Sequence, residues 1–287
     1  MPIPESQLKT WSNQGATVGS ANTYKSVKNA LKSYSFPIGM TYDVYLQGSY
    51  PNHTNIRGDS DVDIVIETNG IFYSNLSQEE RSQKQFTPAS FTWQDFRREI
   101  VQALVNYYGY SNVDDTADKC IKLKDDNGNR LPADIVPCAE YHRYHNSTLH
   151  AVGMTFFTKN YEQIINYPKI HRTNGTAKNE RTYRSYKSNV RVFKNARNQL
   201  TSKSSQFPSY FLECLLYNIS DTCFGYSYAQ TFECVLRELC KKRDLEGLEK
   251  FVTQNEQDYL FGFSSWQTSK SSAVELINDF VELWNNW

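Results

Sequence analysis

Two acidic side chains, Asp61 and Asp63, stand two residues apart in a stretch where acidic and apolar residues alternate. The alternation, continued by Val62, Ile64 and Ile66, predicts a strand that points both carboxylates to one face. At ~4 Å in a half-buried site, two such charges repel by roughly 4 kcal/mol unless one is protonated or a cation lies between them. Mg²⁺ suits oxygen-only ligands and usually keeps phosphates as its other partners. The pair therefore indicates a cation site.

A Gly48-Ser49 turn precedes these acids and follows an apolar stretch, Asp43 to Gln47, that reads as another strand. Such a turn offers backbone N–H groups and a hydroxyl to a polyphosphate. Turn and carboxylates together predict a metal–nucleotide site. The alternative is a solvated strand edge, which we would favour for an isolated Asp-x-Asp because that pattern is short and common.

A third acid, Asp134, interrupts the apolar stretch from Leu131 to Pro137. A lone Asp in an apolar strand is costly unless it has a partner. One explanation is a strand-start Asp that pairs with a surface Lys, and the other is a functional carboxylate. The surrounding residues 113–144 read as sheet, with a hairpin turn expected at residues 126–129.

The rest of the chain changes from mixed to helical patterning. A helix is expected from an N-cap at Thr92 through Tyr108, closed by Gly109. Residues 161–175 read as loop, and from there to the end the pattern is helical. The fold class is therefore α/β followed by an α-helical half.

A helix expected over residues 181–200 carries an apolar stripe with cations beside it. The default interpretation of those cations, which include Lys187 and Lys194, is a solvated face. The alternative is that Lys194 faces a cleft. A further helix begins at Pro208-Ser209-Tyr210, and another is expected over residues 245–253.

Composition excludes several classes of protein. The chain has 287 residues with 31 basic and 31 acidic side chains, so its formal net charge is zero, unlike most duplex-DNA binders. No apolar run is long enough to span a membrane and no signal peptide is apparent. The six cysteines form no Cys-x-x-Cys pair, so we expect a cytoplasmic protein with reduced thiols. Cys138, His142 and His145 are interpreted as a buried thiol and surface histidines rather than a zinc site.

Gln47-Gly48-Ser49, followed by the motif at residues 55–63, resembles the pattern of the nucleotidyltransferase superfamily of the DNA polymerase β type. It is more similar still to the bacterial CD-NTases, cyclic-oligonucleotide synthases of CBASS anti-phage operons, and looks closest to their clade E. The resemblance covers nearly the whole chain. It implies a nucleotidyltransferase palm with N-terminal helices over residues 1–170 and a helical lobe over residues 171–287.

The resemblance also implies roles for individual residues. Asp61, Asp63 and Asp134 match the catalytic carboxylates, which would hold two Mg²⁺ ions, with Mn²⁺ as an alternative. Nucleotide-binding residues would be Gln47, Gly48, Ser49, Asn166, Lys194, Ser209 and Tyr210. Among these, Ser49, Lys194 and Ser209 would hold the triphosphate and Tyr210 would stack on a base. Asn166 would help choose a pyrimidine, as in clade E members with Asn in a similar Asn-Tyr-Pro stretch.

The implied activity is a cyclic dinucleotide synthase that uses UTP and ATP and makes cyclic UMP-AMP or cyclic di-UMP. A separate effector protein would read the product, no nucleic-acid activator or membrane is expected, and the protein would be a monomer. Two other functions stay open. A nucleotidyltransferase acting on an RNA end or an aminoglycoside uses the same three carboxylates, and a non-catalytic nucleotide sensor is a different class.

Overall fold

The computed structural model describes residues 1–58, 61–126, 130–146, 148–245, 247–262, 264 and 267–287. Residues 59–60 of the acidic motif, and residues 127–129 of the expected hairpin turn, lie outside this set. The chain divides into two compact units, and each is described by itself. The sheet unit comprises Thr17–Tyr50 and Ser60–Lys169, and the helical unit comprises Met1–Ala16, Pro51–Asp59 and Ile170–Trp287. The expected domains, residues 1–170 and 171–287, stay a prediction.

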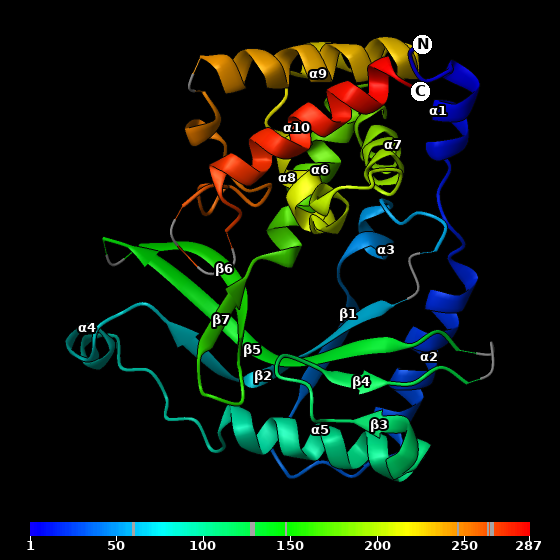
Figure 1. Cartoon of the computed structure of the whole chain (residues 1–287). Helices are drawn as coiled ribbons and strands as arrows, with labels where there is room; N and C mark the ends of the chain where they lie inside the picture. Colours follow the sequence, from blue (N-terminus) through cyan, green and yellow to red (C-terminus); the bar gives the residue numbers. More distant parts are fainter. Residues whose placement is uncertain (59–60, 127–129, 147, 246, 263, 265–266) are drawn as a thin grey trace. The chain divides into compact units, whose positions relative to one another are not determined.

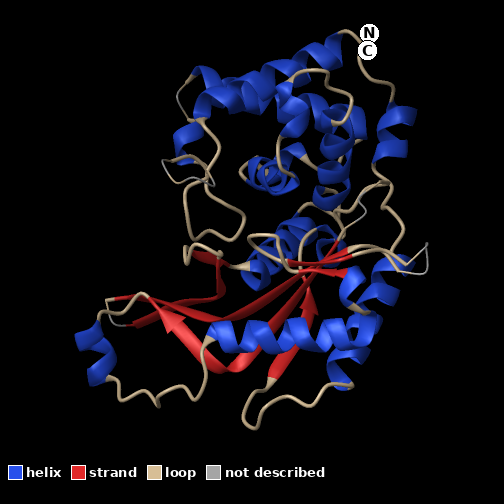
Figure 2. Ribbon diagram, turned by 60° about the horizontal axis from the view of Figure 1, so that its bottom comes forward, coloured by secondary structure: helices blue, strands red, loops and turns tan. Residues whose placement is uncertain are grey.

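The sheet unit is built on a mixed sheet with helices against it (Figures 1 and 2). Its strands are β1 (Tyr42–Leu46), β2 (Val62–Ser74), β3 (Val113–Asp114), β4 (Ile121–Leu123), β5 (Ala133–His145), β6 (Thr148–Phe157) and β7 (Gln163–Asn166). Its helices are α2 (Val18–Lys32), α4 (Gln78–Gln83) and α5 (Trp93–Tyr108), with a 3₁₀ turn over Tyr110–Asn112. These described strands form one sheet in the order β1-β2-β5-β4-β3, while β6 pairs with the later part of β5 and β7 pairs with β6. Strands β2 and β5 are parallel, and the other pairs are antiparallel.

Alternation along β2 separates the two faces of the sheet. Val62, Ile64 and Ile66 are fully buried in one hydrophobic core with residues of α2 and α5. Val65 belongs to a second core, with residues of β5 and β6. Asp63 lies on the same face of the sheet as Val65, because residues two apart on a strand point the same way.

Helix α5 confirms the expected capping. The Thr92 side chain accepts from the Asp95 backbone N–H, and the Asp95 carboxylate accepts from the Thr92 N–H, which is a capping box. The helix ends where Gly109 takes a positive φ of 82°. The capping residue Thr92 and the terminal Gly109, both predicted from the sequence, thus set the two ends of this helix.

The helical unit contains most of the remaining helices. They are α1 (Glu5–Trp11), α7 (Tyr186–Arg197), α8 (Ser209–Tyr217), α9 (Tyr228–Asp244) and α10 (Lys270–Asn285), with 3₁₀ turns over Lys203–Gln206, Asp221–Cys223 and Leu248–Lys250. Two helices, α3 (Ser49–Asn52) and α6 (Pro168–Arg181), each include a boundary between the units. The core of the helical unit gathers Leu8 from α1, Phe193 from α7, Leu212 from α8, Phe232 from α9 and Phe280 from α10.

Three sequence expectations about elements were wrong. Residues 161–175 are not loop, since β7 pairs with β6 and α6 begins at Pro168, a residue well suited to a first helical position. The helix expected over 181–200 begins at Tyr186, because Tyr183 and Arg184 adopt positive φ angles of 53° and 64°. The helix expected over 245–253 is only the 3₁₀ turn Leu248–Lys250.

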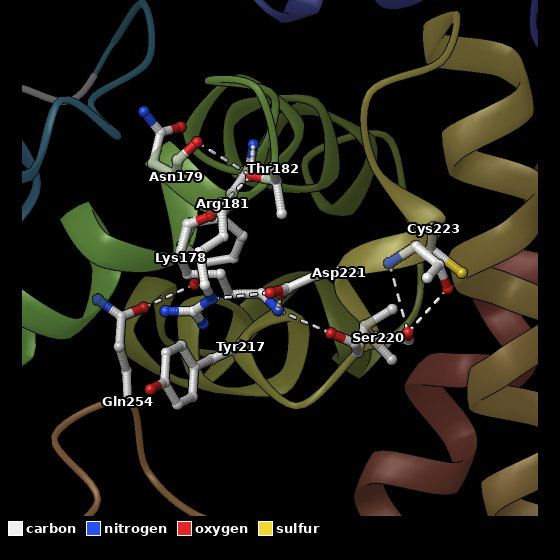
Figure 3. A network of polar contacts seen from close by, with 12 residues as sticks. Lys178, Asn179, Arg181, Thr182, Tyr217, Ser220, Asp221, Cys223 and Gln254 are labelled. Atoms are coloured by element: carbon white, nitrogen blue, oxygen red, sulfur yellow. Dashed lines mark hydrogen bonds and ion pairs between the residues drawn. The ribbon is translucent and has the colours of Figure 1, made fainter.

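The expectation of reduced thiols was wrong for one pair, since Cys223 and Cys234 form a disulfide. Beside it, an ion cluster ties the end of α6 to the turn that carries Asp221 (Figure 3). The buried Lys178 ammonium and the Arg181 guanidinium contact the two oxygens of Asp221 at 2.7 and 2.8 Å. Among the described residues, no helix is long and apolar enough to cross a membrane.

Candidate active site

The register of β2 and β5 brings two of the three predicted carboxylates side by side. Asp63 and Asp134 are Cα partners on these parallel strands, and both residues are half-buried. Neighbouring strands lie about 4.8 Å apart, so two charges at that spacing repel by roughly 3 kcal/mol at an effective dielectric constant of 20. Asp61 is exposed and comes directly before β2, which begins at Val62, so it lies at the edge of the sheet instead of within the strand.

Gly48 approaches one of these carboxylates closely. The preceding residue, Gln47, donates its backbone N–H to the Asp63 carbonyl oxygen at 3.0 Å, where β1 leaves the sheet. Gly48 itself has a φ of +73°, and a Cβ atom there would lie 2.2 Å from Asp63 Oδ2. Only glycine fits this turn, for both its conformation and the space available. Ser49 follows as the half-buried first residue of α3.

A cysteine that the sequence did not single out lies against the same carboxylates. Burial, followed by the charge and hydrogen bond of Asp134, raises the pKa of the Cys120 thiol to about 12, and the charge of Asp63 adds to the effect. Lys122 acts in the opposite direction and is the cross-strand partner of Asp134 on β4. Burial contributes most to the raised pKa of Cys120, and the charges of both carboxylates act in the same direction. Sequence gave no signal for Cys120, because its place depends on the pairing of β4 with β5.

The donor set fits a hard divalent cation in its chemistry. Asp63, Asp134 and Asp61 offer oxygens only, and a cation would remove the repulsion between the facing pair. Among the described residues, no group of three or more His, Cys, Asp or Glu side chains is arranged closely enough to hold a metal ion. Asp63 and Asp134 are thus the part of the predicted ligand set that strand register pairs, and Asp61 directly precedes β2.

Asn166 lies on the carboxylate face of the sheet, further along it. On β5, Asp134 and Glu140 share one face; Glu140 is the Cα partner of Met154 on β6, and Met154 is the partner of Asn166 on β7. Directly paired residues point to the same face of a sheet. Asp134 and Asn166 therefore lie on the same face. Asn166 is the last residue of β7 and is exposed.

The other predicted nucleotide-binding residues belong to the helical unit. Lys194 on α7 is fully buried, and its ammonium donates to the Thr54 carbonyl oxygen at 3.0 Å. The solvated cationic face considered for this helix was therefore wrong for Lys194, and also for Lys187, which is 9% exposed. A buried ammonium requires a compensating partner.

The charge of Lys194 also acts on a buried carboxylate, Glu213 on α8. It accepts from Thr54 Oγ1 at 2.7 Å and lies 3.1 Å from His171 Nε2. Burial acts to raise the pKa of Glu213, but the hydrogen bonds from His171 and Thr54, with the charge of Lys194, outweigh it and lower the pKa. Sequence reasoning missed Glu213, because its partners come from distant segments.

Ser209 and Tyr210 open α8 directly after Pro208. Arg197 donates to the Ser209 hydroxyl at 3.4 Å. The Tyr210 ring stacks on His171, with ring centroids 5.3 Å apart, and keeps 41% of its surface exposed. A partly exposed tyrosine that stacks on a second ring is suited to stacking on a nucleobase.

Comparison with known proteins places this geometry in a family. A family model for the C-terminal helical domain of cGAS/DncV-like nucleotidyltransferases matches residues 173–285. The cyclic UMP-AMP synthase of Rhodothermus marinus is 43% identical over 100% of this chain and 99% of its own length. Its structure with Apcpp and Upnpp has a TM-score of 0.92, with 42% identity over 100% of this chain and 98% of that one. A cyclic dinucleotide synthase of Elizabethkingia meningoseptica, solved with GTP and Apcpp, has a TM-score of 0.80 and 27% identity over 99% and 100% of the two chains.

The expected resemblance and fold class are thereby confirmed. The relatives are named as cyclic nucleotide synthases, which are nucleotidyltransferases. With this identity over its full length, the chain belongs to the cGAS/DncV-like nucleotidyltransferases, the CD-NTases, and is an enzyme of the cyclic nucleotide synthase type.

Proposed function

We propose that this enzyme makes a uridine-containing cyclic dinucleotide from nucleoside triphosphates in a Mg²⁺-dependent reaction. The observation that carries the proposal is the matched register of Asp63 and Asp134, with the Gly48 turn against one of the two carboxylates. The named relatives support cyclic nucleotide synthesis as the activity. Anti-phage defence, with a separate effector that reads the product, is the setting that we propose from the resemblance to CBASS enzymes.

Each predicted residue has a task in this reaction. Asp61, Asp63 and Asp134 would hold two Mg²⁺ ions, and Mn²⁺ has the same ligand preference. Bound there, the ions would lower the pKa of the acceptor hydroxyl and stabilise the pyrophosphate that leaves the α-phosphorus. Ser49, with the Gly48 turn, would orient the phosphates of the donor.

Residues of the helical unit would hold the donor nucleotide. Ser209 would contact the triphosphate, and Tyr210 would stack on its base. Lys194 would contact the triphosphate by exchanging the Thr54 carbonyl oxygen for a phosphate oxygen. The linear dinucleotide would bind again and be closed into a ring by a second transfer. The stacking of Tyr210 on His171 supports this role, because it holds the Tyr210 ring in a fixed plane on which a base could stack.

Asn166 is the proposed determinant of the uracil preference. Its side-chain amide carries a donor and an acceptor, which complement O4 and N3–H of uracil. The N6–H₂ and N1 of adenine are complementary too, so the depth of the base pocket must contribute. One good pair contributes roughly 1–3 kcal/mol, about five- to a hundredfold in base preference. The relative from Rhodothermus marinus, a UMP-AMP synthase, supports UTP as a substrate.

The test supplies equimolar NTPs with Mg²⁺ to the wild-type enzyme and identifies phosphatase-resistant products by mass spectrometry. A uridine-containing cyclic product supports the proposal, and a purine-only product refutes the use of UTP. Product formed only with added RNA or aminoglycoside would instead indicate a transferase to that acceptor, and no turnover would indicate a nucleotide sensor.

The role of Asn166 is tested by Asn166→Ser in the same assay. We expect the product to shift from uridine toward purines while the total yield stays comparable, because the residue chooses a base and does not contact the reacting phosphorus. Identical product ratios from the two proteins would show that Asn166 is only a turn former before Tyr-Pro.

A further inference from the structure

A buried carboxylate on the active face of β2 has no task in the reaction described above. Glu67 lies four residues after Asp63 and is 4% exposed. Four residues of strand span about 13 Å, so Glu67 lies further along the sheet from the Asp63 and Asp134 pair. A charge buried at that place is costly unless its oxygens are paired.

Both oxygens of Glu67 are paired. Lys169 Nζ contacts Oε1 at 2.6 Å, and the Tyr45 hydroxyl donates to Oε2 at 2.6 Å. The Lys169 ammonium also lies 4.8 Å from the centre of the Tyr45 ring. Burial, with the charges of Cys138 and Glu67, raises the pKa of the Tyr45 phenol well above its usual value, so the hydroxyl stays a donor. We call Tyr45, Glu67 and Lys169 the Glu67 cluster.

The Glu67 cluster fixes the segment that carries Asn166. Lys169 is three residues after Asn166, in the first turn of α6, so its contact with Glu67 ties this turn to β2. A second anchor lies on the other side. Tyr167 is buried, and a Cβ atom on Gly153 would lie 2.6 Å both from the Tyr167 ring and from the Asn166 carbonyl oxygen. The backbone at Asn166 is therefore held from β6 and from β2.

We propose that Glu67 and Tyr45 are positioning residues for base selection, acting through Lys169 on the placement of Asn166. This inference rests on the proposed function, in which Asn166 reads the base. Asn166 is exposed, so the direction of its side chain is set mainly by the position of its backbone. A paired contact to a base edge needs placement to within about 0.5 Å, which an unanchored strand end does not give.

The test measures kcat/KM for the two NTPs that the wild-type enzyme uses best, in Glu67→Gln and Tyr45→Phe. We expect the ratio of the two values to shift by about three- to tenfold, a part of the effect of losing the base contact itself. The shift should lie in the KM of the NTP read by Asn166, with the KM of the other unchanged. Tyr45→Phe removes one hydroxyl, so it keeps the test valid if Glu67→Gln does not fold.

Asp221→Asn is the matched control. It weakens two ion pairs of similar length, those of Asp221 with Lys178 and Arg181, at the other end of the same helix α6 (Figure 3). We expect it to lower thermal stability and to leave the base ratio unchanged. The inference is overturned if both cluster variants keep the wild-type ratio, or if Asp221→Asn shifts it equally. Failure of the proposed function is a separate outcome, namely a wild-type product without uridine.

Discussion

Replacing Gly48 by alanine tests the central geometry of the sheet unit. A non-glycine residue at a φ of +73° costs about 1–2 kcal/mol in unfolding free energy. The added Cβ would also lie 2.2 Å from Asp63 Oδ2, so the carboxylate must turn away. A displacement of about 1 Å at a reacting centre lowers rates by roughly a hundredfold, or about 3 kcal/mol in barrier height. We expect Gly48→Ala to lower the Tm by roughly 2–8 °C and to lower the turnover rate by about two orders of magnitude.

Gly109→Ala separates the two effects. Gly109 has a similar φ of +82° at the end of α5, but a Cβ atom there meets nothing within 4 Å. It should therefore lose a similar amount of stability with near-normal turnover. Thermal unfolding and initial rates of pyrophosphate release, measured on both variants, decide the matter. If the two variants lose turnover equally, or if Gly48→Ala stays active, then Gly48 does not position Asp63.

Further predictions concern charge. Asp61→Asn or Asp63→Asn should abolish product formation, while metal-free thermal stability stays the same or rises because repulsion falls; near-normal turnover in both would refute the metal site. Nuclease-treated protein should synthesise product without added duplex DNA, because the net charge is zero, and a large stimulation by DNA would contradict this. Glu213 has a pKa below its usual 4.5, so its stabilising effect is present above pH 4.5 and is lost as pH falls toward the lowered value. Denaturant unfolding at a series of pH values should show a flatter acid limb for Glu213→Gln, and equal slopes would contradict the expectation.

Local patterns predicted the parts of the fold that depend on local physics. Alternation of acidic and apolar residues identified β2, and the Thr92 cap identified α5, because each signal lies within a few residues. The break before α7 was missed, since Tyr183 and Arg184 are not residue types that favour positive φ. The parallel pairing of β2 with β5 was also beyond local patterns, because it joins segments about seventy residues apart.

Burial of charge was the least predictable feature. Helical periodicity counts every lysine as polar, so it assigned Lys194 to a solvated face or a cleft edge. The structure buries this ammonium against the Thr54 carbonyl oxygen, which comes from another segment, and its charge acts on the buried Glu213 carboxylate of a third. Which cation of an amphipathic helix is buried thus depends on partners that only the tertiary fold brings together.

The position of Asp134 distinguishes a structural from a functional carboxylate. A structural Asp at a strand start would be satisfied by a lysine, and Lys122 is indeed its cross-strand partner on β4. On the other side, however, its partner is Asp63. The roughly 3 kcal/mol of repulsion between the two acids brings no benefit to folding. Repulsion between neighbouring acids, which lowers the stability of the fold, is expected where a site binds a cation. The register of β2 and β5 is therefore a stronger argument for a cation site than the Asp-x-Asp spacing alone.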